Sequence, residues 1–195
     1  VIGPPGTGKT FLLIMAALYA SALGYYCSLT TIAAERSASF SGIHAHANAG
    51  LSTNENHSVA ELAAFGVNKL SKNPISLAFI RKLDILFVEE IGMMSSEQYC
   101  AMDLIYQHIR GNRLPFGGVL VIGTGDPRQL RPPSGSLLWM SPLMLTSFKL
   151  HSLSEFVRMD RNGEGQRLLE LMGTAAIDET TADDIVDIIS RSCVF

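Results

Sequence analysis

The chain has 195 residues, of which 47% are hydrophobic and 17% are charged, and this composition argues against disorder and coiled coils. Its formal net charge of −3 argues against a domain whose main task is to grip nucleic acid, but it is compatible with a motor that touches DNA along one edge. The cysteines Cys27, Cys100 and Cys193 lie far apart, which argues against a disulfide framework or zinc site and favours a reducing compartment.

The first predicted elements are a glycine-rich loop and a helix. Val1-Ile2 should end a strand, Gly3–Gly8 should form the loop, and Lys9 to about Leu23 should form the helix. Apolar residues lie nearly all round this helix, as expected for burial against a sheet. The apolar run is shorter than the roughly 20 residues that a membrane-spanning helix needs, so no membrane segment is expected. Because no Met precedes so short a strand, we expect an N-terminally truncated sequence.

The next stretch is predicted to hold a strand, a long polar loop and short helices. Ser58-x-x-Glu61 is a capping-box pattern, so a helix should start there. Pro74 suits the first turn of another helix. The predicted ranges are 25–29 for the strand, 32 to about 38 for a helix, 41–56 for the loop, and 58 to about 65 and 74 to about 83 for two further helices.

Two continuous apolar runs, Ile85–Val88 and Val119–Ile122, are typical of parallel strands that are buried on both faces. Between them Ser95-x-x-Gln98 is a second capping box, which predicts a helix to about Arg110. The remaining predictions are a loop at 123–135, a strand at 148–150, and helices at 165–172 and 182–191. Strands and helices alternate, so the sequence predicts an α/β fold with a mostly parallel sheet and helices on both faces.

The loop before the first helix matches the phosphate-binding pattern G-x-x-x-x-G-K-[ST] with Gly3-Pro4-Pro5-Gly6-Thr7-Gly8-Lys9-Thr10. Glycines let backbone N–H groups turn inward around a phosphate, and the following helix points its N-terminus at the same anion. Lys9 can then reach the β- and γ-phosphates, and the Thr10 hydroxyl can ligate Mg²⁺. The sequence therefore predicts a nucleoside triphosphate site here.

Two carboxylates, Glu89 and Glu90, follow the apolar strand Ile85–Val88. Nucleotide hydrolases of this class use one such group to hold Mg²⁺ and a second to orient or deprotonate the attacking water. Adjacent residues of a strand point to opposite sides, so the two can take separate roles. The first residue of this pair is usually Asp. Magnesium tolerates poor geometry badly, so Glu89 predicts either binding through water or a weakened enzyme.

A third element, Gly125-Asp126-Pro127-Arg128-Gln129-Leu130, follows the next apolar strand. A glutamine at the carboxyl end of a neighbouring strand can contact the γ-phosphate and report its loss. With the phosphate loop and the acidic pair before it, this element resembles the first RecA-like motor domain of a superfamily-1 DNA helicase of the 5′→3′ branch. In particular, the chain resembles the petite-integration-frequency (PIF) family, which includes the helicases of Helitron transposons.

Four further segments resemble motifs of this family. Leu29–Ala34 is similar to APTGxAA, with Pro and Gly replaced, and Gly42-Ile43-His44 is similar to G-x-T-x-H, with Thr missing. The segment 87–94 resembles hhIDEhSMh, with Glu89 for Asp and Gly92 for Ser, and Ser154–Arg158 resembles the segment that ends in an arginine finger. The resemblance implies a RecA-like phosphate-loop NTPase domain over 1–160 and a helical segment over 161–195 that leads toward a second lobe, which is missing.

The family resemblance implies ATP-dependent DNA unwinding with ATP and Mg²⁺ as cofactors. It implies that Lys9 and Thr10 bind phosphate and metal, and that Glu89 is the metal-side carboxylate. It further implies that Glu90 is the general base, that Gln129 senses the γ-phosphate, and that Arg158 stabilises charge in the transition state. Because the second lobe is missing, the chain alone is expected to bind nucleotide weakly and to unwind nothing.

The implied partners are single-stranded DNA and duplex junctions, with Thr30, Thr31 and His44 as the DNA contacts. Arg110, Arg113, Arg128 and Arg131 are further candidates for phosphate contacts. Trp139 is expected in the core rather than stacked on a base. The resemblance also implies an intracellular protein, nuclear or mitochondrial if eukaryotic, that acts in DNA repair, recombination, telomere maintenance or transposition.

Two other interpretations remain open at this point. Glu89 and the missing second lobe favour a degenerate nucleotide-binding module with little or no catalysis. A helicase-loader type of phosphate-loop ATPase is the other alternative, and Gly125-Asp126-x-x-Gln129 argues against it, because loaders typically place an Asn there.

Overall fold

The computed structural model describes residues 1–32, 43–44, 49–51, 57–129, 131–155, 167 and 183–184. Its centre is a parallel sheet in the order β2-β1-β3-β4. The strands are β1 (Cys27–Thr31), β2 (Ile43–His44), β3 (Ile85–Glu89) and β4 (Leu120–Gly123). Beyond β4, Ile2 makes isolated parallel bridges to Gly125 and Ser152, so the phosphate loop starts beside the end of β4.

The helices begin where the sequence places its caps. Ser58 and Ser95 both form complete capping boxes, and the Asn73 side chain accepts from two N–H groups at the start of the helix that Pro74 opens. The α-helices are α1 (Lys9–Ala22), α4 (Val59–Ser71), α5 (Pro74–Lys82), α6 (Ser96–Arg110) and α7 (Pro142–Ser147). The 3₁₀ turns are η2 (Ile91–Met93), η3 (Pro115–Gly118) and η4 (Leu138–Met140).

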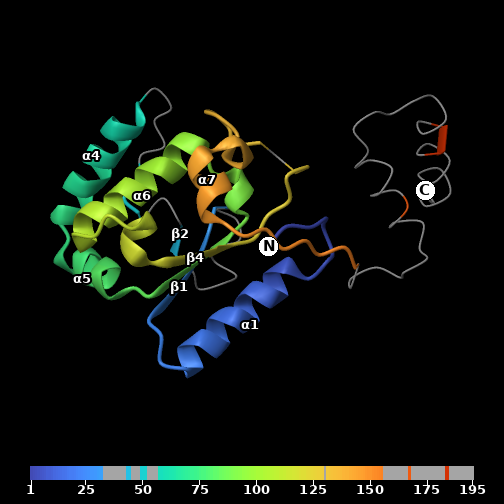
Figure 1. The fold of residues 1–195 in the computed structure, drawn as a ribbon, viewed down its shortest axis with the longest axis horizontal. Coiled ribbons are helices and arrows are strands. Elements are labelled where there is room, and N and C mark those ends of the chain that lie inside the picture. The colour runs from blue at the N-terminus through green and yellow to red at the C-terminus, as the bar shows by residue number, and fades with distance from the viewer. Residues whose placement is uncertain are drawn as a thin grey trace, which may run out of the picture.

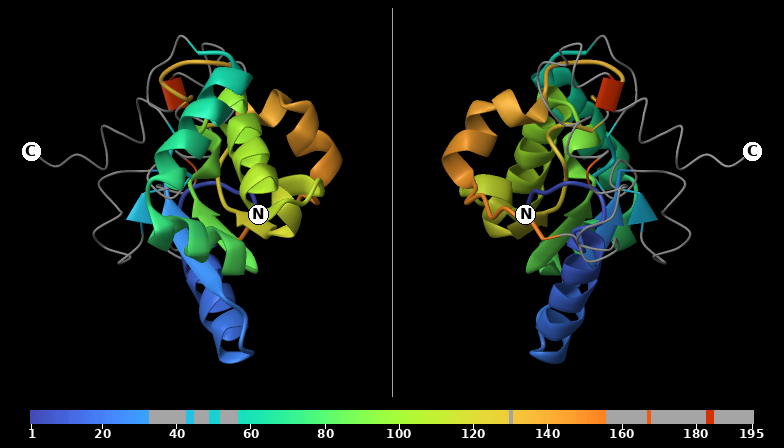
Figure 2. Two further views of the ribbon diagram at one scale, coloured as in Figure 1. Left: turned by 90° about the vertical axis from the view of Figure 1, so that its left-hand side faces the viewer. Right: turned by 90° about the vertical axis from the view of Figure 1, so that its right-hand side faces the viewer.

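Helices cover both faces of the sheet, as predicted. Ile85 and Phe87 of β3 form one small core with Leu13 of α1. The alternate residues Leu86 and Val88 belong to the larger core on the other face, to which α4, α5 and α6 contribute. Figures 1 and 2 show α1 on one side of the sheet and α4, α5 and α6 on the other. The alternation along β3 therefore explains why its apolar run is continuous.

The structure corrects the expectation that α1 is buried all round. Leu13 and Ala20 are the apolar residues of α1 that are buried. Its outer face carries exposed apolar side chains, among them Phe11 at 70% and Tyr19 at 68%. The helix therefore packs on the sheet along a narrow stripe.

The ends of several other elements differ from the prediction. β1 begins at Cys27 because its pairing with β3 starts there, opposite Ile85, and α4 continues to Ser71. The predicted strand at 148–150 is absent: the Phe148 N–H bonds to the Met144 carbonyl at the end of α7, a helix that the sequence did not predict. The helices predicted at 32–38, 165–172 and 182–191 lie wholly or mostly outside the described residues.

Candidate nucleotide-binding site

The phosphate loop turns through two glycines that have positive φ angles. Gly6 has φ 85° and Gly8 has φ 82°, a region that L-residues with side chains rarely occupy. The Thr7 hydroxyl donates to the Pro4 carbonyl at 2.9 Å and closes the loop on itself. Helix α1 starts directly after Gly8 and has no side-chain cap, and the N-terminus of a helix is a favourable place for an anion such as a phosphate.

Lys9 lies over this loop and is only 8% exposed. Its Nζ donates to the carbonyls of Gly3 at 2.7 Å and Pro4 at 2.9 Å. The ammonium group is therefore held inside the turn where the motif predicts the triphosphate. Ionised acceptors bind an ammonium more strongly than neutral carbonyls do, so a phosphate oxygen can replace them.

The phosphate loop and the acidic strand meet at Thr10 and Glu89. The Thr10 hydroxyl donates to Glu89 Oε1 at 2.7 Å, although the two residues are 79 positions apart. Glu89 is the last residue of β3 and is 2% exposed. A hydroxyl and a carboxylate oxygen in contact are oxygen ligands of the kind that Mg²⁺ takes. The residues present therefore fit a magnesium ion between loop and strand.

Glu90 leaves the strand in the left-handed conformation, with φ 54° and ψ 41°. A non-glycine residue rarely adopts these angles, and such strain clusters at functional sites. The turn is held by the Ile91 N–H, which donates to the Thr124 carbonyl at 2.9 Å, and by the Thr124 N–H, which donates to the Val88 carbonyl at 2.9 Å. Glu90 is half-buried, whereas Glu89 is buried.

The third sequence element begins beside the phosphate loop. The Gly3 N–H donates to the Gly125 carbonyl at 3.3 Å, and the Gly125 N–H donates to the Val1 carbonyl at 3.1 Å. Asp126 is 5% exposed, and its Oδ1 accepts from the Arg128 backbone N–H at 3.0 Å. The Gln129 N–H donates to the Asp126 carbonyl at 3.1 Å, and the Gln129 side chain is exposed. Phosphate loop, acidic turn and glutamine turn thus lie at one edge of the sheet.

The predicted DNA contacts lie in the sheet, where Thr31 is in register with Glu89. Thr30 and Thr31 lie in β1 and are each 1% exposed, and the Thr30 hydroxyl donates to the Phe87 carbonyl at 3.0 Å. Thr30 therefore has a structural role in the sheet, whereas DNA contact by either threonine stays a prediction. The His44 backbone forms the end of β2 beside Thr31. Arg158 lies outside the described residues.

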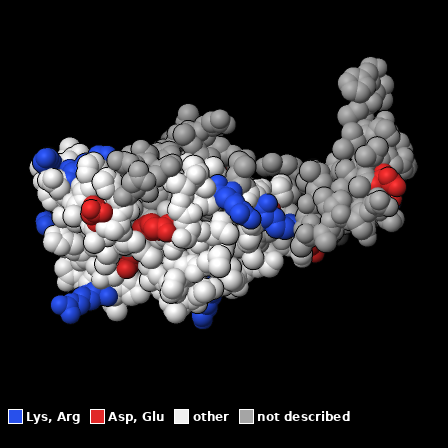
Figure 3. All heavy atoms as spheres, turned by 90° about the horizontal axis from the view of Figure 1, so that it is seen from above, with Lys and Arg blue, Asp and Glu red and all other residues white. Residues whose placement is uncertain are grey.

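Charged residues do not form one continuous basic surface on the face that Figure 3 shows, where blue atoms lie in separate groups among white ones. Two of the candidate arginines bond within the chain: Arg110 donates to backbone carbonyls, and Arg128 Nε lies 3.4 Å from Asp126 Oδ1. Within the described ranges no three His, Cys, Asp or Glu side chains gather as a metal-binding group. No helix of the described part has the length and apolar character that crossing a bilayer requires.

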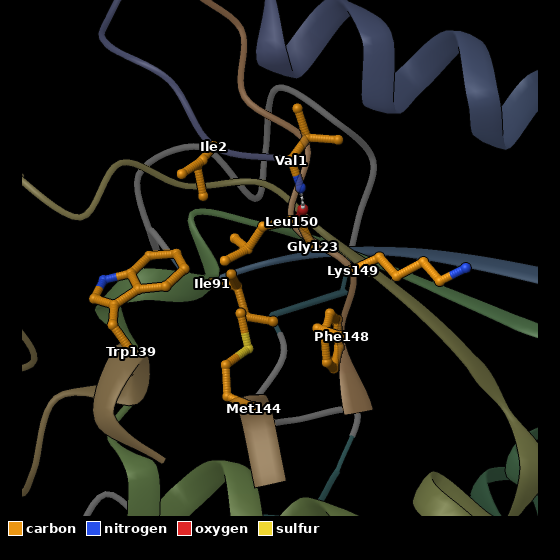
Figure 4. Close-up of a pocket in the computed structure, with 9 residues that line it drawn as sticks. All are labelled: Val1, Ile2, Ile91, Gly123, Trp139, Met144, Phe148, Lys149 and Leu150. Atoms are coloured by element: carbon orange, nitrogen blue, oxygen red, sulfur yellow. Dashed lines mark hydrogen bonds between the residues drawn. The ribbon is translucent and has the colours of Figure 1, made fainter. Parts of the chain in front are cut away.

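Sequence patterns did not reveal that Trp139 lies beside this site. The side chain is half-buried, as expected from its size, but it packs against Gly92 and Gly125 of the two turns. Figure 4 shows it next to Ile91 in a crevice of about 10 Å³ that Val1, Ile2 and Gly123 also line. No local motif marks this contact, because it joins three segments that are distant in the sequence.

The comparisons with known proteins agree with this geometry. A family model described as PIF1-like helicase matches residues 1–142. The chain is 29% identical over 173 residues to the ATP-dependent DNA helicase Pif1 of Psychrobacter sp. (strain PRwf-1), which covers 84% of this chain and 25% of that protein.

Two solved structures share the fold. The Pif1 helicase of Candida albicans matches with a TM-score of 0.78 and 21% identity over 94% of this chain and 42% of that one. The Bacteroides Pif1 helicase in complex with ADP-AlF3 and single-stranded DNA matches with a TM-score of 0.71 and 18% identity over 93% and 43%. The chain thus spans a quarter of that curated relative and less than half of each solved structure. With a RecA-like fold and a family match over most of its length, the chain belongs to the PIF1-like helicase family.

Proposed function

We propose that this chain is the ATP-hydrolysing first lobe of a DNA helicase, which couples hydrolysis to translocation on single-stranded DNA and to duplex unwinding. The observation that carries the proposal is the 2.7 Å hydrogen bond between Thr10 and Glu89, which joins the phosphate loop to the acidic strand. The family match and the names of its relatives support the same class of protein.

Each residue of the site has a role that its position supports. The glycine turns and the start of α1 would bind the triphosphate, with Lys9 as its cation. Thr10 and Glu89 would hold Mg²⁺, which neutralises charge on the phosphates when bound. Glu90 would accept the proton of the attacking water.

Two further roles are needed to link ATP hydrolysis to movement. Gln129 would contact the γ-phosphate and carry its loss to the turn that starts at Gly125. Arg158 would stabilise charge in the transition state.

The DNA part of the proposal rests on relatives. A Bacteroides Pif1 structure contains single-stranded DNA, and another Pif1 structure concerns forked duplex DNA. For this chain we propose DNA contact near the ends of β1 and β2, at Thr30, Thr31 and His44. An intracellular location and a role in DNA repair, recombination, telomere maintenance or transposition are proposed on the same basis.

DNA-stimulated ATP hydrolysis by the full-length protein tests the proposal. Lys9→Ala and Glu90→Gln should each abolish turnover, because one removes the phosphate cation and the other the base. Glu89→Asp should keep or raise turnover, because it restores the shorter side chain usual at this position. ATP hydrolysis by Lys9→Ala at the wild-type rate would refute the proposed enzymatic function.

The same experiment separates the main alternative, a degenerate nucleotide-binding module. Glu89 is the observation that favours it, since the longer side chain changes the place of the metal-side oxygen. If the wild-type protein binds ATP without hydrolysing it, and Glu89→Asp makes it active, the degenerate module is the correct interpretation.

A further inference from the structure

Trp139, the single tryptophan of the chain, touches both turns that carry the proposed chemistry. A Cβ atom built on Gly92 would lie 2.7 Å from Cζ2 of the indole, and one built on Gly125 would lie 3.3 Å from Cη2. Neither glycine can therefore gain even a methyl group without pressing on the ring. The indole fills the space between the turn after β3 and the turn after β4.

These two turns hold residues for which function has been proposed. Gly92 follows Glu90 by two positions, and Gly125 directly precedes Asp126. The turns are bonded to each other through Ile91 and Thr124, and the second is bonded to the phosphate loop through Gly3. A displacement of the ring would therefore act on the general base and on the glutamine turn together, because close-packed groups transmit strain.

The segment that carries the indole is also held at the start of α6, which follows the Glu90 turn in the chain. Leu137 makes an isolated antiparallel bridge with Ser95, at the start of α6. Ser136 donates from its backbone N–H to Glu97 Oε2 at 2.9 Å and from its hydroxyl to Glu97 Oε1 at 2.7 Å. Leu138 is completely buried. The segment that carries Trp139 is thus anchored both at the start of α6 and by the packing of its indole on Gly92 and Gly125.

We propose that Trp139 is a positioning residue, which sets the spacing between the Glu90 turn and the Asp126–Gln129 turn and moves when the nucleotide state changes. The inference rests on the proposed function, because it needs a nucleotide at the phosphate loop. It adds a residue that acts through Gly92 and Gly125 and does not touch the reacting atoms.

A double-mutant cycle tests the positioning role. Gly92→Ala should lower kcat for DNA-stimulated ATP hydrolysis about tenfold, since small misplacements of reacting groups cost that much or more. The KM for ATP should stay within about twofold, because the phosphate loop is untouched. Adding Trp139→Leu makes room for the new methyl group, so the double variant should be more active than Gly92→Ala alone.

Gly111→Ala serves as the stability control. A Cβ atom at Gly111 meets nothing within 4 Å, but its φ of 61° is unfavourable for alanine. This variant should lower Tm without changing kcat. Trp139→Phe, which keeps an aromatic ring at the contact, should retain more activity than Trp139→Leu.

The fluorescence of Trp139, measured on this 195-residue chain in which it is the single tryptophan, gives a second readout that does not need turnover. Mg²⁺ with a slowly hydrolysed ATP analogue should shift or quench the emission of the wild-type protein, and Lys9→Ala should abolish the change. If calorimetry shows that the analogue binds but the emission is unchanged, or if Trp139→Leu fails to rescue Gly92→Ala, the positioning role is wrong while the proposed function stands. If the wild-type protein binds no analogue at all, the proposed function itself fails.

Discussion

Thr10 and Glu89 show how one hydrogen bond can define a site. The carboxylate is 2% exposed, and its Oε1 accepts a hydrogen bond from the Thr10 hydroxyl at 2.7 Å. Hydroxyl and carboxylate oxygens are the ligands that a hard divalent cation such as Mg²⁺ takes. The hydroxyl therefore supports the fold and, in the proposed function, the metal site.

Replacing this hydroxyl should weaken both functions. Thr10→Val keeps the shape of the side chain but leaves the buried carboxylate without this donor, so Tm should fall. The affinity for MgATP should fall at least about tenfold, a loss of roughly 1.4 kcal/mol. Calorimetric titration with and without EDTA measures this. Thr10→Ser, which keeps the oxygen, is the control, and equal affinity of Thr10→Val and wild type would exclude Thr10 as a ligand.

Position 3 needs a glycine because the backbone at Leu153 passes close to it. A Cβ atom at Gly3 would lie 2.5 Å from the Leu153 carbonyl oxygen and 3.0 Å from the Thr7 hydroxyl. We expect Gly3→Ala to lower Tm and to abolish ATP binding, because the turn cannot keep its shape. Thermal melting with and without MgATP measures both effects. Stabilisation of the variant by MgATP as large as in wild type would contradict this account.

Local patterns predicted the residues of the site better than its contacts. The phosphate loop and the Glu89-Glu90 pair are contiguous motifs whose residue types have a chemical reason, so they could be found in the sequence. The packing of Trp139 on Gly92 could not be found, because it depends on how η2 and η4 meet. The burial of Thr30 and Thr31 was also missed, since it follows from where β1 ends.

At the scale of elements, one arginine joins the end of α5 to the end of α6. Arg110 Nη1 donates to the carbonyls of Ile80 and Leu83, each at 2.8 Å, and Nε donates to the Gly117 carbonyl at 2.8 Å. Carbonyls at the ends of helices have no partner within the helix, so a side-chain donor satisfies them. Arg110 is therefore part of the scaffold.

Truncating this side chain should destabilise the protein without affecting the site. Arg110→Met keeps most of the aliphatic stem but removes every donor, which should cost about 2–3 kcal/mol of unfolding free energy. Arg113, which is exposed, is the matched control, and Arg113→Met should change stability by less than about 0.5 kcal/mol. Urea denaturation of both variants provides the comparison. Equal stability of the two would show that the bonds of Arg110 contribute nothing.

The contact between Glu97 of α6 and Ser136, which holds the segment that leads into η4, should depend on pH. Burial raises the pKa of this carboxyl group, but the hydrogen bonds from Ser136, from Ser95 and from the Glu97 backbone together outweigh burial and hold the pKa below its ordinary value of 4.5. A lowered folded-state pKa means that the unfolded chain binds the proton more readily. The stabilisation is therefore present above pH 4.5 and is lost as pH falls through the lowered pKa.

The matched pair for this effect is wild type and Glu97→Gln. The variant should melt at a lower temperature at neutral pH, and the difference should shrink as both proteins are acidified. Melting curves at descending pH measure it. If the difference in melting temperature stays constant with pH, the charge of Glu97 has no part in its contact with Ser136.

Element types were predictable where the sequence carries a physical signal. The capping boxes at Ser58 and Ser95 gave the starts of α4 and α6, and the continuous apolar run gave β3. The ends of β1 carry no such signal, because they are set by its register with β3. Helix α7 does carry one, since Pro142 stands in its first turn after Ser141, but the prediction overlooked it.

At the scale of the whole molecule, the parallel sheet explains why distant motifs meet. The strands of a parallel sheet all end at one edge, and ligands of α/β folds bind at that edge. The phosphate loop, Glu89 and Glu90 after β3, and Gln129 after β4 come together there. The order β2-β1-β3-β4 also leaves Ile2 next to the end of β4, which brings the phosphate loop to the glutamine turn.

The central claim is that this edge of the sheet binds MgATP, and calorimetric titration of the chain with ATP tests it most directly. The account predicts binding that needs Mg²⁺, disappears in Lys9→Ala and weakens in Thr10→Val. Binding that persists unchanged in Lys9→Ala, or no binding by the folded wild-type chain in the presence of Mg²⁺, would contradict it.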